Sequence, residues 1–417
     1  MKKVGSAHPT AMLTRPDEAG PCKQGTRVPR SINVTIDETI QQCRDLLDLL
    51  PGEALAKARE RYPDVGGFGV FPVYAPVEII HAAGLMPVGM FGAGNKVEIS
   101  HADSRFQSFI CSIAKSTLEL FLRDEMKDFS GVVFSSICDV ARNLASLVHR
   151  NVPDLYVEYL HMPQNLYSEG SIAYSRSEFQ RFRNNLSKHL GRPITDEAIG
   201  KSLNLYNKAR GLTRTLYEHR KARPGSITAA ELCTVVQAGT CMMPEDFVAL
   251  LEPLVEQVRT RKTHSRDCVN VVVEGAFCEQ PPIGLVEVIE AAGCQVRDDD
   301  MMIGWRLFNE DICFNGDPMG ALAEAYLKSS CYTSVRHDRD NPRAEQLMRR
   351  MDQAGADAVI FAPAKFCEPA LLDYVLYRKR LDEGDVPHLK IEFEEKMWTF
   401  ESTRTEVETF AESMLFE

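Results

Sequence analysis

The sequence lacks the short motifs that mark the common nucleotide and zinc sites. It contains no G-x-G-x-x-G and no G-x-x-x-x-G-K-[ST], so neither a dinucleotide site nor a P-loop is supported. None of its cysteines falls in a C-x-x-C pair, which excludes a zinc ribbon or thioredoxin-type site written in one segment. No spacing typical of a catalytic triad stands out. Any metal site must therefore be assembled from distant segments.

Positive charge and long apolar runs are also scarce. The chain has 48 Lys and Arg against 59 Asp and Glu, a net charge of −11, which argues against a nucleic-acid partner. The longest apolar stretch, Phe68–Met90, contains Glu78, His81 and three prolines, so we expect no membrane span. Met1–Arg30 has no apolar signal-peptide core. We therefore expect a cytoplasmic protein whose N-terminus is a loose tail or an arm that lies on a partner.

The chain alternates strand and helix patterns on both sides of a helical stretch. At 417 residues it should form two or three domains. We predict an α/β fold: two doubly wound, Rossmann- or flavodoxin-like parallel-sheet domains with a helical insert between them. The expected boundaries are 1–35 (tail), 36–172 (first α/β domain), 173–262 (helical domain) and 263–417 (second α/β domain). Strands are predicted at Gly67–Tyr74, Met86–Gly92, Gly131–Phe134, Leu155–Leu160, Cys268–Glu274, Ala358–Ala362 and Leu389–Phe393.

Helix starts are marked by capping residues and prolines. Thr35 is a predicted N-cap for one helix that continues to Arg61. Thr228 begins a T-A-A-E capping box in the insert, where Thr195 is placed to open another helix. Pro76 is placed to open a short helix that Gly84 ends.

Twelve cysteines are more than packing requires in a chain without an export signal. Cys138 and Cys367 each follow a predicted strand and precede a helix, Cys111 stands near a helix start, and Cys278 is a fourth candidate. Helix N-termini favour the thiolate, which is the form that binds metal. Three or four such thiolates in a cleft between two domains could hold an iron–sulfur cluster. The alternative is that they are scattered core thiols.

Two polar patterns also admit two interpretations. Glu78 and His81 are three residues apart on one helical face, so both could reach a cleft, or they could be a capping carboxylate and an ordinary helix histidine. The acidic run Asp298–Asp300 could bind a cation, but a turn at the end of a strand is the more common role.

Four segments resemble the benzoyl-CoA reductase / 2-hydroxyacyl-CoA dehydratase family. They read FPVYAPVEIIHAAG (71–84), FICSI (109–113), SSICDV (135–140) and KFCEP (365–369), and the resemblance spans roughly residues 40–395. It implies a [4Fe-4S] cluster bound by Cys111, Cys138 and Cys367, with a non-protein ligand at the fourth iron. Further segments, CEQPP (278–282), RDDD (297–300) and CDVARN (138–143), look closer to the reductase branch.

The resemblance implies an oxidoreductase subunit that carries out one-electron reduction of an aromatic acyl-CoA thioester. The implied partners are a homologous cluster-bearing subunit, an ATPase component with its own iron–sulfur cluster, and ferredoxin as electron donor. Glu78 and His81 then become candidate polar groups of the substrate pocket. Three alternatives stay open: a dehydratase that eliminates water from a 2-hydroxyacyl-CoA (a lyase), a non-catalytic iron–sulfur subunit, and a metal-free, thiol-rich binding protein.

Overall fold

The computed structural model describes residues 34–71, 75–166, 168–263, 266–275, 279–301, 310–329, 342–394 and 396–416. Residues Thr35–Glu417 form one compact unit, separate from Met1–Val34, and only this unit is described below. The predicted tail falls almost wholly outside the described residues. The division of the compact unit into three domains stays a prediction.

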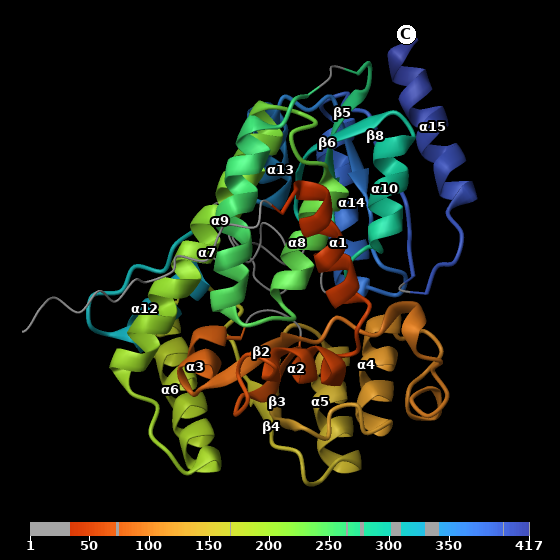
Figure 1. Cartoon of the computed structure of the whole chain (residues 1–417). Helices are drawn as coiled ribbons and strands as arrows, with labels where there is room; N and C mark the ends of the chain where they lie inside the picture. The colour runs from red at the N-terminus through yellow and green to blue at the C-terminus, as the bar shows by residue number, and fades with distance from the viewer. Residues whose placement is uncertain are drawn as a thin grey trace, which may run out of the picture. The chain divides into compact units, whose positions relative to one another are not determined.

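Two four-stranded parallel sheets carry the fold, which confirms the predicted fold class. The first has the order β2-β1-β3-β4 and the second the order β6-β5-β7-β8, so the two have the same topology. Figure 1 shows β1–β4 grouped with α4 and α5, and the second sheet with α10 and α14. The strands are β1 Gly66–Phe71, β2 Leu85–Gly89, β3 Phe129–Ser135, β4 Val157–Leu160, β5 Val269–Glu274, β6 Cys294–Asp299, β7 Ala358–Phe361 and β8 His388–Lys390.

Strand register places the carboxyl ends of neighbouring strands together. Phe71 pairs with Phe134 at the ends of β1 and β3, and Glu274 pairs with Phe361 at the ends of β5 and β7. In each sheet the chain reverses its winding direction between these two strands, and open α/β sheets bind ligands outside such switch points. The segments that follow β1, β3, β5 and β7 are therefore the places to look for a site.

Helices cover the sheets because their apolar faces need burial. Those around the first sheet are α2 Pro51–Arg59, α3 Val77–Ala82, α4 Ser112–Leu122 and α5 Asp139–Asn151, with short 3₁₀ helices η1 Gly94–Lys96 and η2 Asp103–Arg105. Those around the second are α10 Ile283–Ala291, α13 Arg343–Ala354, α14 Glu368–Asp382 and α15 Glu401–Leu415. The helix α12 Pro318–Glu324, which the π-helical turn η3 Ala325–Ser329 continues, packs instead against α6 (Ser171–Leu190). Phe68 of β1 and Val271 of β5 belong to the same buried hydrophobic cluster, which therefore joins the two sheets.

Four helices lie in the stretch predicted as a helical insert. They are α6 Ser171–Leu190, α7 Asp196–Ala222, α8 Ala229–Gly239 and α9 Pro244–Thr260. The predicted caps are confirmed: Thr195 accepts a hydrogen bond from the Ala198 amide, and Thr228 forms a reciprocal capping box with Glu231. A second hydrophobic cluster packs α7, α8 and α9 together with α1 (Ile36–Leu47).

The prediction of one helix over Thr35–Arg61 is wrong. Thr35 does open a helix with a full capping box, but α1 ends at Leu47 and α2 begins at Pro51. Leu50 is extended (φ −75°, ψ 161°) because a residue that precedes proline avoids the α-helical region. The apolar spacing continues across this break and hides it.

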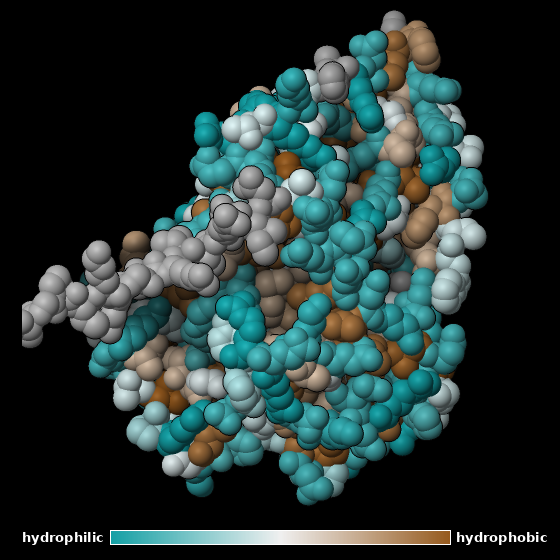
Figure 2. All heavy atoms as spheres, viewed as in Figure 1, coloured by the Kyte–Doolittle hydropathy of each residue, from teal (hydrophilic) through white to brown (hydrophobic). Residues whose placement is uncertain are grey.

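Within the described residues no helix is both long and apolar enough to cross a membrane. The face seen in Figure 2 is mostly hydrophilic, with hydrophobic residues scattered among the polar ones. This distribution agrees with a charged-residue content of 26%.

Candidate functional site

Three of the predicted cysteines occupy the same kind of position in the fold. Cys111 is the N-cap of α4, Cys138 the N-cap of α5, and Cys367 the N-cap of α14. Cys111 and Cys367 are buried, and Cys138 is partly buried. Unpaired amides and the positive end of the dipole at a helix start favour a negatively charged sulfur. The prediction that all three stand at helix N-termini is confirmed.

The loop between β3 and Cys138 is fixed by the neighbouring strand β4. The Ser136 amide donates to the Leu160 carbonyl at 2.9 Å, and the Ser136 hydroxyl accepts from the Met162 amide at 2.7 Å. The Cys138 sulfur in turn accepts a hydrogen bond from the Ala141 amide at 3.4 Å. This sulfur is therefore held at the start of α5 rather than swinging into the core.

The loop before Cys367 is fixed in a strained conformation. Ala364 makes a parallel bridge with Phe393, and the Cys367 amide donates to the Ala364 carbonyl at 3.0 Å. Phe366 has φ +65°, a left-handed backbone that side chains other than glycine adopt rarely. Strain of this kind persists only where the surroundings hold it, and functional sites are common places for it. Here the strained residue, Phe366, directly precedes Cys367, which caps α14.

The three thiols influence one another electrostatically. Burial raises the pKa of Cys111 well above its usual value, and the negative charges of Glu279, Cys138 and Cys367 raise it further. Burial also raises the pKa of Cys138 to about 11; its hydrogen bond from Ala141 opposes the shift, and the Cys367 charge adds to it. The fold therefore brings these three sulfurs together from distant parts of the chain. Burial thus favours the neutral thiol at Cys111 and Cys138.

Three cysteine thiols are a donor set that iron–sulfur clusters take. Among the described residues, no three His, Cys, Asp or Glu side chains gather closely enough to hold one metal ion. The corners of an iron–sulfur cluster are separate irons, so its thiolate ligands stand farther apart than the ligands of one zinc ion. A cluster on Cys111, Cys138 and Cys367 therefore agrees with the chemistry of its donors and stays a prediction.

One carboxylate next to Cys111 was not identified from the sequence. Glu279, between β5 and α10, accepts a hydrogen bond from the Ser112 hydroxyl at 2.5 Å and a longer one from the Ile113 amide at 3.5 Å. Both donors lie in the first turn of α4, directly after Cys111. The neighbouring candidate Cys278 lies outside the described residues, so its position stays a prediction.

Glu78 and His81 connect α3 to the helical insert. Glu78 is 2% exposed and forms an ion pair with the buried Arg210 of α7. His81 contacts the Ser202 hydroxyl through Nδ1 at 2.9 Å and Glu245 through Nε2 at 3.1 Å. These contacts join α3 to α7 and α9. A role of Glu78 and His81 in a substrate pocket stays a prediction.

The acidic run Asp298–Asp300 is buried at the end of β6. Asp299 accepts from Arg220 at 2.7 Å, and Asp298 accepts from Nε of Arg350 at 3.1 Å. Both arginines are supplied by helices that pack on the sheet. Asp298 and Asp299 thus serve as partners of buried arginines at a strand end.

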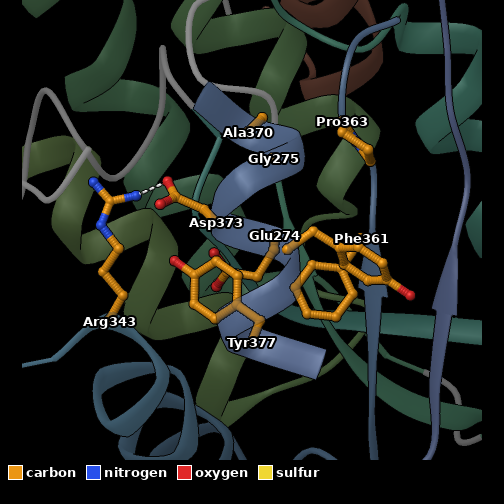
Figure 3. A pocket seen from close by; sticks show the side chains of 9 residues that line it. Glu274, Gly275, Arg343, Phe361, Pro363, Ala370, Asp373 and Tyr377 are labelled. Atoms are coloured by element: carbon orange, nitrogen blue, oxygen red, sulfur yellow. Dashed lines mark hydrogen bonds and ion pairs between the residues drawn. The ribbon is translucent and has the colours of Figure 1, made fainter. Parts of the chain in front are cut away.

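A small pocket opens at the carboxyl ends of β5 and β7, the switch point of the second sheet. Figure 3 shows Phe361 and Tyr377 on one side and Ala370 of α14 close by. An ion pair between Arg343 and Asp373 closes another side. Ala370 lies three residues after Cys367, so the pocket adjoins the helix that Cys367 caps. Its walls are aromatic, and its charges are paired.

Comparison with known proteins identifies relatives over most of the chain. The sequence model of the family described as "2-hydroxyglutaryl-CoA dehydratase, D-component" matches residues 72–414. A benzoyl-CoA reductase subunit of Thauera aromatica is 34% identical over 90% of this chain and 98% of its own length. The beta subunit of lactoyl-CoA dehydratase of Anaerotignum propionicum is 29% identical over 84% of this chain and 92% of its own. The beta subunit of (R)-2-hydroxyglutaryl-CoA dehydratase of Acidaminococcus fermentans is 26% identical, over 83% and 92%.

Proposed function

The chain belongs to the 2-hydroxyglutaryl-CoA dehydratase D-component family, and on that premise we propose that it is the [4Fe-4S]-carrying subunit of a benzoyl-CoA reductase-type enzyme. The observation that carries the proposal is the position of Cys111, Cys138 and Cys367 at three helix N-termini, with the charges of Cys138 and Cys367 acting on Cys111. The reductase branch is favoured by the 34% identity to the benzoyl-CoA reductase subunit of Thauera aromatica over nearly its whole length.

Cys111, Cys138 and Cys367 would hold the cluster, leaving one iron for a non-protein ligand. When bound, the cluster would supply single electrons at low potential to an acyl-CoA thioester. The N-termini of α4, α5 and α14 would stabilise the thiolates, while burial of Cys111 and Cys367 would exclude water from the site. The chain's contribution is thus to orient three sulfurs and to keep them dry.

Glu78 and His81 are proposed as polar groups of the acyl-CoA pocket. The ion pair between Glu78 and Arg210 fixes that carboxylate in place, which suits orientation better than proton donation. His81 Nε2 lies 3.1 Å from Glu245. His81, paired with Glu245, is therefore the group on α3 that is proposed to transfer a proton to the substrate.

The proposed assembly includes a homologous cluster-bearing subunit, an ATPase component with its own cluster, and ferredoxin as electron donor. Relatives whose names mark them as subunits of acyl-CoA enzymes support a hetero-oligomer. The absence of a P-loop in this sequence agrees with ATP being used by another subunit.

A second candidate is a subunit of a 2-hydroxyacyl-CoA dehydratase, because the family description and two of the relatives carry that activity in their names. Net electron consumption separates the two reactions. A reductase consumes electrons with every turnover, whereas eliminating water from a 2-hydroxyacyl-CoA is redox-neutral and returns the electron.

The test uses the complex purified without oxygen after co-production with its partner subunits. It is given ATP, reduced ferredoxin, and either benzoyl-CoA or a 2-hydroxyacyl-CoA. The proposal predicts oxidation of ferredoxin in proportion to benzoyl-CoA consumed. Conversion of the hydroxyacyl-CoA alone, with no net oxidation of ferredoxin, would establish the dehydratase instead.

A further inference from the structure

Glu279 is a buried carboxylate that one half of the fold contributes to a helix of the other. It follows β5 and is 1% exposed, yet its hydrogen-bond donors, Ser112 and Ile113, belong to α4 between β2 and β3. The first turn of α4 contains no acidic residue of its own. Glu279 therefore supplies from elsewhere the negative charge that a helix N-terminus favours.

The other two cysteine-capped helices differ in this respect. Asp139 in the first turn of α5 and Glu368 in the first turn of α14 follow Cys138 and Cys367 directly, and both are exposed to solvent. Water and salt screen such charges, whereas a buried charge acts strongly on its neighbours. Of these three acids, only Glu279 is buried, so its charge acts on the sulfurs with little screening by solvent.

The effect of Glu279 on Cys111 is opposite to what a reactive cysteine needs. The Glu279 carboxylate binds Ser112 and Ile113, the two residues directly after Cys111, so it lies beside that cysteine. A nucleophilic thiol is normally activated by positive surroundings. Next to an iron–sulfur cluster, a negative charge disfavours the addition of an electron. It therefore lowers the reduction potential of the cluster.

We propose that Glu279, acting through Cys111, keeps the reduction potential of the cluster low. The inference rests on the proposed function, since it requires the cluster. Glu279 does not touch the reacting atoms, so it is a positioning residue. Its carboxylate places a fixed buried charge beside one thiolate and ties the segment after β5 to the start of α4.

The test compares the full-length chain, purified without oxygen after cluster assembly, with its Glu279→Gln variant. Glutamine keeps an oxygen that can accept from Ser112 but removes the charge. Iron content is measured first, and the midpoint potential is then followed by electron paramagnetic resonance during a redox titration. We expect the variant to keep the iron content of the wild type. At a fixed potential its ratio of reduced to oxidised cluster should be about tenfold higher, which corresponds to a midpoint potential raised by ~59 mV for a one-electron couple.

Two variants serve as controls. Glu368→Gln removes an exposed acid beside Cys367 and should change the ratio by less than about twofold, because solvent screens it. Glu279→Asp keeps the charge and should stay close to wild type. If Glu279→Gln changes the reduced-to-oxidised ratio by no more than Glu368→Gln does, the inference is overturned. A wild-type chain without iron would overturn the proposed function itself.

If Glu279→Gln loses iron, Ser112→Ala replaces it in the comparison. That change removes the hydroxyl that holds the carboxylate beside Cys111 and favours its charged form, so the inference predicts a higher reduced-to-oxidised ratio. An unchanged or lower ratio would overturn it. A purely structural role for Glu279 would leave the potential of the remaining cluster where it is in the wild type.

Discussion

Cys138 and Cys367 occupy equivalent places in the two halves of the molecule. Each caps the helix that follows the third strand of its sheet, β3 in one case and β7 in the other. The Cys367 charge raises the pKa of Cys138, so the two sulfurs are also neighbours in space. Two sheets of identical strand order thus place corresponding sulfurs within reach of each other's charge, and both charges also act on Cys111.

The segment before Cys111 should depend on Glu119, a carboxylate in α4 whose side chain is fully buried. Burial opposes its ionisation, but donors from Ala102, Arg123 and His101 outweigh that effect and hold its pKa at about 2. Glu119→Gln should lower the free energy of unfolding at pH 7 by on the order of 2–3 kcal/mol. Urea unfolding measures this, with the exposed Glu98→Gln as control, expected to change it by less than about 0.5 kcal/mol.

The same carboxylate predicts a pH dependence. The folded-state pKa of Glu119 lies below its ordinary value of 4.5, so its stabilisation is complete above about pH 4.5 and is lost as the pH falls toward 2. The stability difference between wild type and Glu119→Gln should therefore shrink steadily over that range. A difference that stays constant from pH 6 to pH 3 would show that Glu119 is not ionised with a depressed pKa in the fold.

Glu78 should be essential for stability because it neutralises Arg210. Glu78→Ala leaves a buried guanidinium without its carboxylate and should cost about 3–5 kcal/mol in thermal or urea unfolding. Glu78→Ala combined with Arg210→Met removes both charges and should recover most of that loss. If Glu78 also orients the substrate, the double variant will be stable but inactive. Equal losses in the single and double variants would contradict the ion-pair account.

The left-handed backbone at Phe366 should distinguish two substitutions that both remove the ring. Phe366→Gly fits φ +65° without strain, whereas Phe366→Val places a β-branched side chain there. We expect the glycine variant to be more stable by about 1–2 kcal/mol in urea unfolding and to keep its iron. Equal stabilities would mean that Phe366 is not held in this conformation.

Local chemistry made much of the fold predictable. Capping threonines, proline at helix starts and short apolar runs are properties of a few consecutive residues, and Thr228 and Pro76 illustrate both kinds. The strand β6 was not predicted because its sequence, CQVRDD, resembles a polar turn. Its acids are buried only because Arg220 and Arg350 arrive from distant helices.

The candidate site likewise contains residues that local sequence could place and one that it could not. Cys138 and Cys367 could be placed because a strand followed by a helix defines where a residue lies. Glu279 could not, because its partner Ser112 is 167 positions away and the helix start near it in sequence is that of α10, not of α4. The local signal was the segment CEQPP (278–282), which contains Glu279. It suggested a branch of the family but did not indicate a contact with α4.

Iron and acid-labile sulfide content of the anaerobically purified full chain tests the central claim most directly. The account predicts about four irons per wild-type chain. Cys111→Ala, Cys138→Ala and Cys367→Ala should each lose the iron while remaining folded by circular dichroism. Cys233→Ala, in α8 of the helical insert, should retain it. A wild-type chain that holds no iron, or any of the three variants that keeps its full content, would contradict the account.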